Sequence, residues 1–161
     1  YNSKSCSFNP KTNGGTVMGL DMYLSGSHFN STLIKKKDGS FEERDRPLLD
    51  DKYPIESSDI LLGYWRKHAD LHGMIVETFA DGVDECQKIP LTKDKLRSII
   101  DAVKSDKLVK DHSGFFFGNS TDNGSYSKES KDETVESFEL AMEFLEEDEG
   151  EWRDVWYRAS W

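Results

Sequence analysis

The sequence predicts an α+β fold in which about three helices pack against a small, mainly antiparallel sheet. Segments 18–24 and 155–161 have the composition of strands, and the first of them alternates apolar with polar residues. Three further segments, 64–80, 92–103 and 128–147, repeat apolar residues with the 3.6-residue period of a helix that faces a core.

The chain has 161 residues, the size of one domain. Only 35% of the residues are hydrophobic, but 12% are aromatic, and each aromatic ring buries a large area. A folded core is therefore expected. Residues 1–17 are rich in turn and linker residues, so we expect a single domain over residues 18–161 that is preceded by an N-terminal extension.

A β-hairpin is expected after the first strand. Residues 32–34 and Phe41 flank the segment 37–40, whose Asp-Gly pair favours a tight hairpin turn. Residues 42–54 are highly charged and contain two prolines, which predicts a surface loop. A short extended segment is expected within residues 55–62.

The predicted helix at 64–80 has the most continuous apolar face, and we expect it to be central to the fold. The residues that share this face are Trp65, His68, His72, Ile75, Val76 and Phe79. The Asp81-Gly82 pair is typical of a helix C-terminus, because glycine readily adopts the left-handed conformation required there.

Thr92 is a suitable N-cap for the next helix, at 92–103. The third helix, at 128–147, directs an apolar stripe inward that consists of Val135, Phe138, Ala141, Met142 and Leu145. A short strand is expected at 86–89. The phenylalanine-rich segment 113–119 predicts either a buried strand or a tight aromatic loop.

The formal charge of −10 comes from 31 acidic and 21 basic residues. A negative surface repels the phosphates of nucleic acid, so we expect no nucleic-acid partner. The one basic run, Lys35–Lys37, lies near the tip of the predicted hairpin, where lysines commonly protect a strand edge. Because the sequence has neither a bilayer-spanning apolar run nor a recognisable leader, we expect a cytoplasmic protein without membrane contact.

Three residues, His68, His72 and Cys86, are candidate metal ligands. A helix would direct His68 and His72 to one side, because they are four residues apart, as in several zinc sites. The candidates for the third ligand are Cys86, Asp84 and His112. The alternative is that both histidines are buried and hydrogen-bonded to the backbone, in which case the protein needs no cofactor. The acids before Cys86 repel a thiolate, which favours a structural thiol over a nucleophile.

A second set of residues is a candidate ligand-binding site. Its members are Trp65, Arg66, His72, Phe116, Asn119 and Trp156. Aromatic walls with a few polar groups are typical of small-molecule pockets, and Trp and Arg are frequent anchors of protein interfaces. The alternative is that these residues form the core and its rim.

Four motifs occur in order along the chain: MGLDMYL at 18–24, GYWRK at 63–67, SGFFFG at 113–118 and ASW at 159–161. Through these motifs the chain resembles a family of small uncharacterised proteins of tailed bacteriophages and prophages. The resemblance implies an accessory protein of the infected host cytoplasm. It implies no catalytic residue, because members of the family have no assigned activity.

The sequence therefore favours a non-enzymatic, phage-type accessory protein that binds a host protein or a small molecule. In this interpretation, a groove is lined by Trp65, His72, Phe116 and Trp156. The alternative is a small metal-dependent or acid–base enzyme, in which His68, His72 and a third ligand converge. The oligomeric state is not indicated by the sequence.

Overall fold

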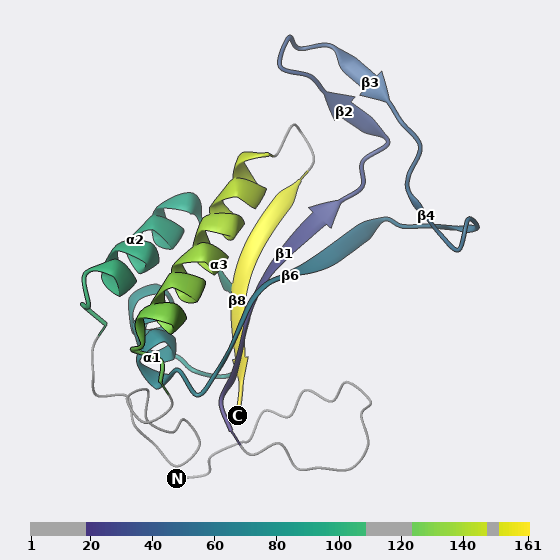
Figure 1. Cartoon of the computed structure of the whole chain (residues 1–161). Helices are drawn as coiled ribbons and strands as arrows, with labels where there is room; N and C mark the ends of the chain where they lie inside the picture. Colours follow the sequence, from purple (N-terminus) through teal and green to yellow (C-terminus); the bar gives the residue numbers. More distant parts are fainter. Residues whose placement is uncertain (1–18, 109–123, 148–151) are drawn as a thin grey trace, which may run out of the picture.

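The computed structural model of the chain describes residues 19–108, 124–147 and 152–161 (Figure 1). Its main feature is a four-stranded antiparallel sheet with the strand order β6-β1-β8-β7. These strands are β1 (Asp21–Phe29), β6 (Ser57–Arg66), β7 (Ile89–Pro90) and β8 (Arg153–Ser160). The central pair, β1 and β8, comes from opposite ends of the described chain.

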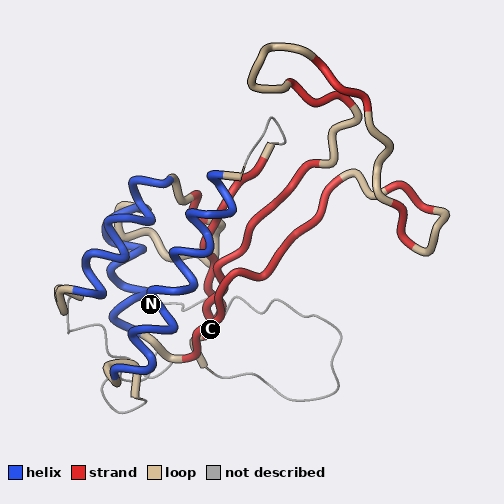
Figure 2. The backbone as a smooth tube through the Cα atoms, turned by 45° about the horizontal axis from the view of Figure 1, so that its top comes forward, coloured by secondary structure: helices blue, strands red, loops and turns tan. Residues whose placement is uncertain are grey.

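Three helices lie on one side of this sheet (Figure 2). They are α1 (Ala69–Phe79), α2 (Lys93–Lys104) and α3 (Lys128–Glu146). On β8, Val155, Tyr157 and Ala159 are buried, whereas the residues between them are partly exposed, as expected for a sheet with one covered face. The predicted α+β fold with a mainly antiparallel sheet is thus confirmed.

Helix α3 packs closely on the sheet because two strand positions beneath it are glycine. A Cβ atom at Gly26 would lie 2.6 Å from the ring of Phe144, and one at Gly63 would lie 3.0 Å from the Cβ of Ser137. Glycine permits this approach because it has no side chain. In the described part of the chain, no helix is both long and apolar enough to cross a membrane.

The predicted helix at 64–80 is wrong in its first turn. Residues up to Arg66 belong to β6, where Trp65 is paired with Met22, and α1 begins only at Ala69. Between β6 and α1, Lys67 has a positive φ of 58°, so the backbone is neither extended nor right-handed helical at this residue. Pairing with the distant β1 therefore overrides the local helical period.

The other helices are confirmed with small changes at their ends. The Thr92 side chain accepts a hydrogen bond from the backbone N–H of Lys95 and caps α2, as predicted. Helix α3 spans all but the last residue of the predicted range. The short strand expected at 86–89 is displaced, because β7 spans only Ile89–Pro90. Segments 1–17 and 113–119 lie outside the described residues.

Residues 30–56, which we call the arm, project from the sheet between β1 and β6 (Figure 1). The arm contains two small antiparallel sheets, which pair β2 (Leu33–Lys35) with β3 (Phe41–Glu43) and β4 (Leu48–Leu49) with β5 (Tyr53–Pro54). The first pair confirms the predicted hairpin. The second pair corrects the prediction of a surface loop at 42–54, because Leu48–Leu49 pair with Tyr53–Pro54 across a turn. We call the remaining described residues the body.

Candidate functional site

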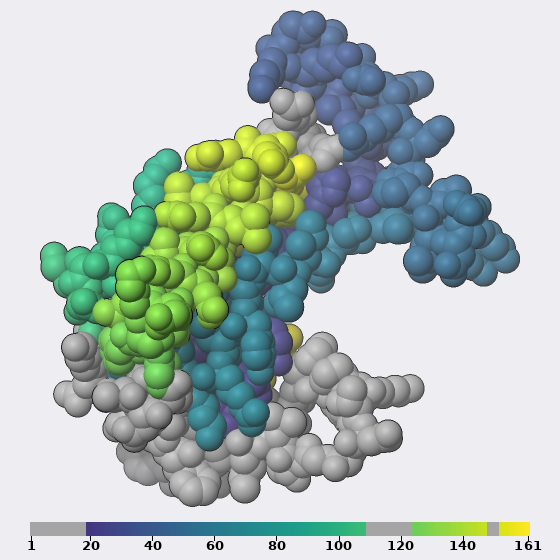
Figure 3. Space-filling view, viewed as in Figure 1, coloured from purple at the N-terminus to yellow at the C-terminus, as the bar shows by residue number. Residues whose placement is uncertain are grey.

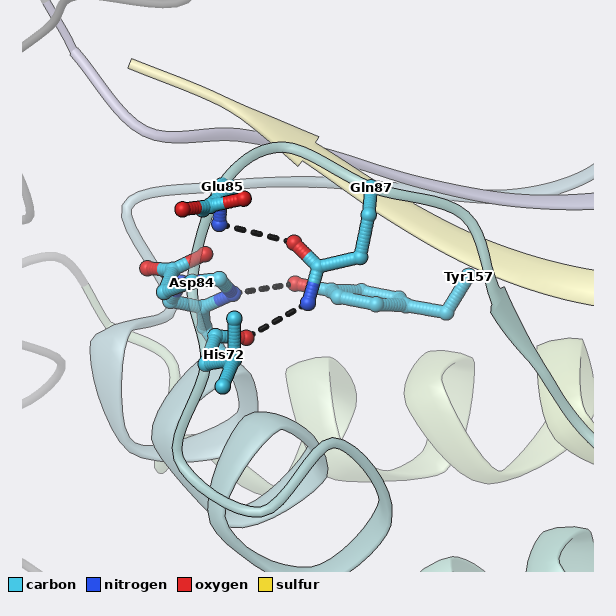
Figure 4. Close-up of polar contacts among 6 residues, drawn as sticks. His72, Asp84, Glu85, Gln87 and Tyr157 are labelled. Atoms are coloured by element: carbon cyan, nitrogen blue, oxygen red, sulfur yellow. Dashed lines mark hydrogen bonds and ion pairs between the residues drawn. The ribbon is translucent and has the colours of Figure 1, made fainter.

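A buried polar cluster in the body centres on His72 (Figure 4). The Nδ1 atom of His72 lies 2.8 Å from the hydroxyl oxygen of Tyr157, and its Nε2 atom lies 2.9 Å from a carboxylate oxygen of Asp84. An ionised carboxylate only accepts hydrogen bonds. We therefore assign the ring proton to Nε2, which donates to Asp84, while Nδ1 accepts from the Tyr157 hydroxyl.

This Tyr–His–Asp chain is sealed at its tyrosine end. Tyr157 is 1% exposed, and burial, together with the charge of Asp84, raises the pKa of its hydroxyl well above the usual value. The Asp84 side chain is 25% exposed and is the member that reaches solvent. The Tyr157 hydroxyl is therefore closed to solvent, and the geometry suits a structural connection between α1, the turn after it and β8.

The loop that carries Asp84 is fixed by a glutamine next to the cluster (Figure 4). The Gln87 side-chain oxygen accepts from the backbone N–H of Glu85 at 2.7 Å, and its Nε2 donates to the carbonyl of Val83 at 2.5 Å. These bonds close the turn around Asp84. The carboxylate is thereby held in position for His72.

His68 and Cys86, the other candidate metal ligands, have separate environments. His68 precedes α1 at its N-cap position, is buried, and lies edge-on to the ring of Tyr126. Burial lowers the pKa of His68 to about 4, although the nearby Asp70 opposes the shift. Cys86 is buried, and its carbonyl oxygen accepts a hydrogen bond from Arg158 at 3.0 Å.

Within residues 19–108, 124–147 and 152–161, no group of three or more His, Cys, Asp and Glu side chains is placed to hold a metal ion. His112, one of the possible third ligands, lies outside these residues. The zinc site therefore stays a prediction from the sequence.

Trp65 and Arg66 point to opposite faces of β6, because successive residues of a strand alternate. The Trp65 indole is in the core, where its Nε1 donates to the hydroxyl of Thr134 at 2.9 Å and its ring stacks on Phe138. Arg66 is exposed, with its Nε 3.8 Å from the buried Asp21 carboxylate. Trp65 and Arg66 are thus neighbours in the sequence, but the first lies in the core and the second at the surface.

Trp156 lies on the sheet face opposite the helices. Its Nε1 donates to the hydroxyl of Ser27 at 3.3 Å, and the Lys88 ammonium lies 3.8 Å from the centroid of its ring. Phe116 and Asn119 fall outside the described residues. Of the six candidate ligand residues, the structure therefore places Trp65 and His72 in the interior, and Arg66 and Trp156 at the surface.

The arm, which extends away from the body in Figure 3, presents a different kind of candidate site made of exposed apolar side chains. Five large apolar side chains of the arm are 49–62% exposed: Leu33, Phe41, Leu48, Leu49 and Tyr53. Three more exposed side chains, Ile60, Leu61 and Tyr64, follow on β6, directly after the arm. We call these eight residues the apolar strip.

Asn30, which is buried, joins the two ends of the arm at its base. Its side-chain Nδ2 donates to the carbonyl of Ile55 at 3.0 Å, and its backbone N–H donates to the carbonyl of Glu56 at 2.8 Å. Its own carbonyl accepts from Arg46 at 3.1 Å. The Arg46 guanidinium in turn lies over the ring of Phe29, which links the arm to β1.

The tip of the arm carries ordered charges. The Lys36 ammonium lies 2.8 Å from the Glu42 carboxylate across the β2–β3 pair, and this contact lowers the pKa of Glu42. The pKa of Asp38 is also lowered, because the side chain and backbone of Ser40 donate to its carboxylate. An open hollow of about 620 Å³ lies nearby, with Leu33 and Arg44 in its wall.

Sequence reasoning overlooked Tyr157 and the apolar strip. Tyr157 is 85 residues from His72, and spacing along the chain carries no signal for such a contact. A signal for the strip was present, since Leu48, Leu49 and Tyr53 interrupt a highly charged segment. However, the sequence alone does not distinguish an apolar residue on an exposed arm from one in a core.

Comparison of the chain with protein-family models, with curated proteins and with solved structures gave no match. The resemblance to phage proteins therefore stays a prediction from the sequence motifs.

Proposed function

We propose that the chain is a non-enzymatic binding protein that holds a partner protein through its arm. The observation that carries this proposal is the apolar strip, which contains eight of the eleven large hydrophobic side chains that are exposed in the described residues. Exposed apolar side chains that are concentrated in one region of a fold typically mark interaction sites.

The arm gains little stability from its own contacts. Its strands are two or three residues long, and isolated two-stranded sheets are marginal in water. Burying the strip against another surface would remove apolar area from water, which is the main favourable term in protein association. An arm with short strands and exposed apolar side chains is therefore suited to bind a partner that covers those side chains.

The charges at the arm tip bear on the chemistry of the partner. The three lysines Lys35–Lys37 are balanced there by Asp38, Glu42 and Glu43, and Lys36 pairs with Glu42. A complementary surface would have an apolar patch bordered by charges of both signs. In view of the resemblance to phage proteins, we propose that this surface belongs to a protein of the bacterial host.

The enzyme alternative receives less support. Its best candidate chain, His72 with Asp84 and Tyr157, is closed to a substrate at the tyrosine hydroxyl. A general acid or base must come within hydrogen-bond reach of the group that reacts. A structural role for this chain is consistent with a protein that acts by binding.

Photocrosslinking tests the proposal. A photoreactive phenylalanine analogue would replace Phe41 on the arm or, as the control, Trp152, which is 78% exposed on the body. In extract of a bacterial host, we expect one cross-linked protein from position 41 and none from position 152. Excess wild-type chain should compete for it, whereas the Leu48→Ser/Leu49→Ser variant should not.

Three results would contradict the proposal. The first is equal cross-linking from both positions, and the second is no cross-linked partner at position 41. The third is a product that contains only a second copy of this chain, which would make the strip a self-association surface.

A further inference from the structure

A pocket of about 660 Å³ lies at the edge of the sheet, away from the arm. It forms where the two-residue strand β7 ends and the chain turns into α2. There the backbone N–H of Leu91 donates to the carbonyl of Val155, which fixes the chain at the pocket floor. The C-terminal part of α3 contributes Leu145 to the wall.

The lining of this pocket includes apolar residues and a tryptophan. Leu91 and Val155 are almost fully buried, and Leu145 is partly buried against the core. Trp156 also lines the pocket. Apolar lining of this kind suits the body of a small organic ligand.

The charged groups around the pocket are mostly positive, in contrast to the chain as a whole. Lys88, Lys93 and Arg153 line it, and Asp154 is the opposing acid. Arg153 is already engaged, because its Nη1 donates to the carbonyl of Phe144 and to the carboxylate of Glu147. Lys88 and Lys93 are therefore the cations best placed to meet an anion.

The two lysines have complementary positions. The Lys88 ammonium lies over the Trp156 ring, 3.8 Å from its centroid, so a ligand that contacts the edge of the indole would lie beside this charge. Lys93 is the first residue of α2, where a cation opposes the helix dipole. A bound anion at this place would offset that repulsion.

From the pocket, its apolar lining and its two lysines, we propose a binding site for a small organic anion with an apolar body. Aromatic carboxylates, sulfonates and phosphates share this chemistry. The site is independent of the proposed arm function, because no residue of the apolar strip lines it. Failure of either proposal would leave the other standing.

Amide NMR titration with 1-naphthoate tests the proposal, and 1-naphthalenemethanol serves as the uncharged probe with the same ring system. We expect naphthoate to shift the signals of the Trp156 indole and the Leu91 amide. It should bind at least about tenfold more tightly than the alcohol, because a charged hydrogen bond is lost with the carboxylate.

The Lys88→Gln/Lys93→Gln variant should weaken naphthoate binding by about tenfold or more, because it removes both cations from the pocket. The control is Lys107→Gln, which changes an exposed lysine just beyond the other end of α2 and should leave the affinity unchanged. The proposal is overturned if the shifts map elsewhere, if both probes bind equally, or if the double variant binds like wild type.

Discussion

The body and the arm use the same kinds of residue in opposite ways. In the body, polar side chains such as His72, Asp70 and Thr134 are buried, and each has a hydrogen-bond partner inside the fold. In the arm, large apolar side chains remain exposed to water. The buried polar groups of the body thus find partners within the fold, whereas the arm leaves apolar side chains in water, which we propose a partner covers.

The same substitution in the two regions should have very different effects on stability. Phe138 is fully buried and stacks on Trp65, whereas Phe41 on the arm is 62% exposed. We expect Phe138→Ala to lower the free energy of unfolding by about 3–5 kcal/mol, and Phe41→Ala to change it by less than about 0.5 kcal/mol. Urea unfolding followed by tryptophan fluorescence measures both. Similar losses for the two variants would remove the distinction between body and arm.

The body should lose stability in mild acid because of His68. The folded chain holds the pKa of His68 near 4, against about 6.5 for an unfolded histidine. The unfolded state therefore binds the proton first as the pH falls. The stabilisation is complete above pH 6.5 and is lost between pH 6.5 and 4, by up to about 3 kcal/mol.

Urea unfolding at pH 7 and at pH 4.5 would measure this loss, with His68→Gln as the matched variant. Asp70 and Tyr126 face His68 and remain in both proteins, so the difference between them reports the imidazole. An unchanged pH dependence in the variant would assign the acid sensitivity to other groups.

The hydroxyl of Tyr157 should matter in the body, whereas a tyrosine hydroxyl on the arm should not. Tyr157→Phe leaves the buried His72 Nδ1 without this donor, which we expect to cost about 1–3 kcal/mol of unfolding free energy. Tyr53→Phe on the arm is the control, with an expected change below about 0.5 kcal/mol. If thermal and urea unfolding find Tyr157→Phe as stable as wild type, the cluster around His72 is not a structural connection.

Features that depend on local spacing could be predicted from the sequence. Helices α2 and α3 have regular apolar stripes and good N-caps, Thr92 and Ser127, so the sequence specifies where they begin. The Asp38-Gly39 turn similarly indicated the first hairpin of the arm. Each of these signals lies within a few residues of the structure that it produces.

Features that depend on distant contacts could not be predicted. Trp65 fits the helical period of the residues after it, yet its pairing with Met22 places it in a strand. The cluster around His72 joins residues that are 85 positions apart. The exposure of the arm is equally hidden, because whether Leu48 is buried depends on where the chain carries it rather than on its identity.

The central claim is that the partner is held through the arm, which carries five of the eight residues of the apolar strip. Strands β1 and β6 are antiparallel neighbours with Phe29 opposite Ser57, so a two-residue Asn-Gly turn can replace residues 30–56 and close them into a hairpin. The most direct measurement is competition between this armless chain and wild type for the partner cross-linked at position 41. We predict that the armless chain, with its body folded, does not compete even in large excess. Competition equal to that of wild type would contradict the account.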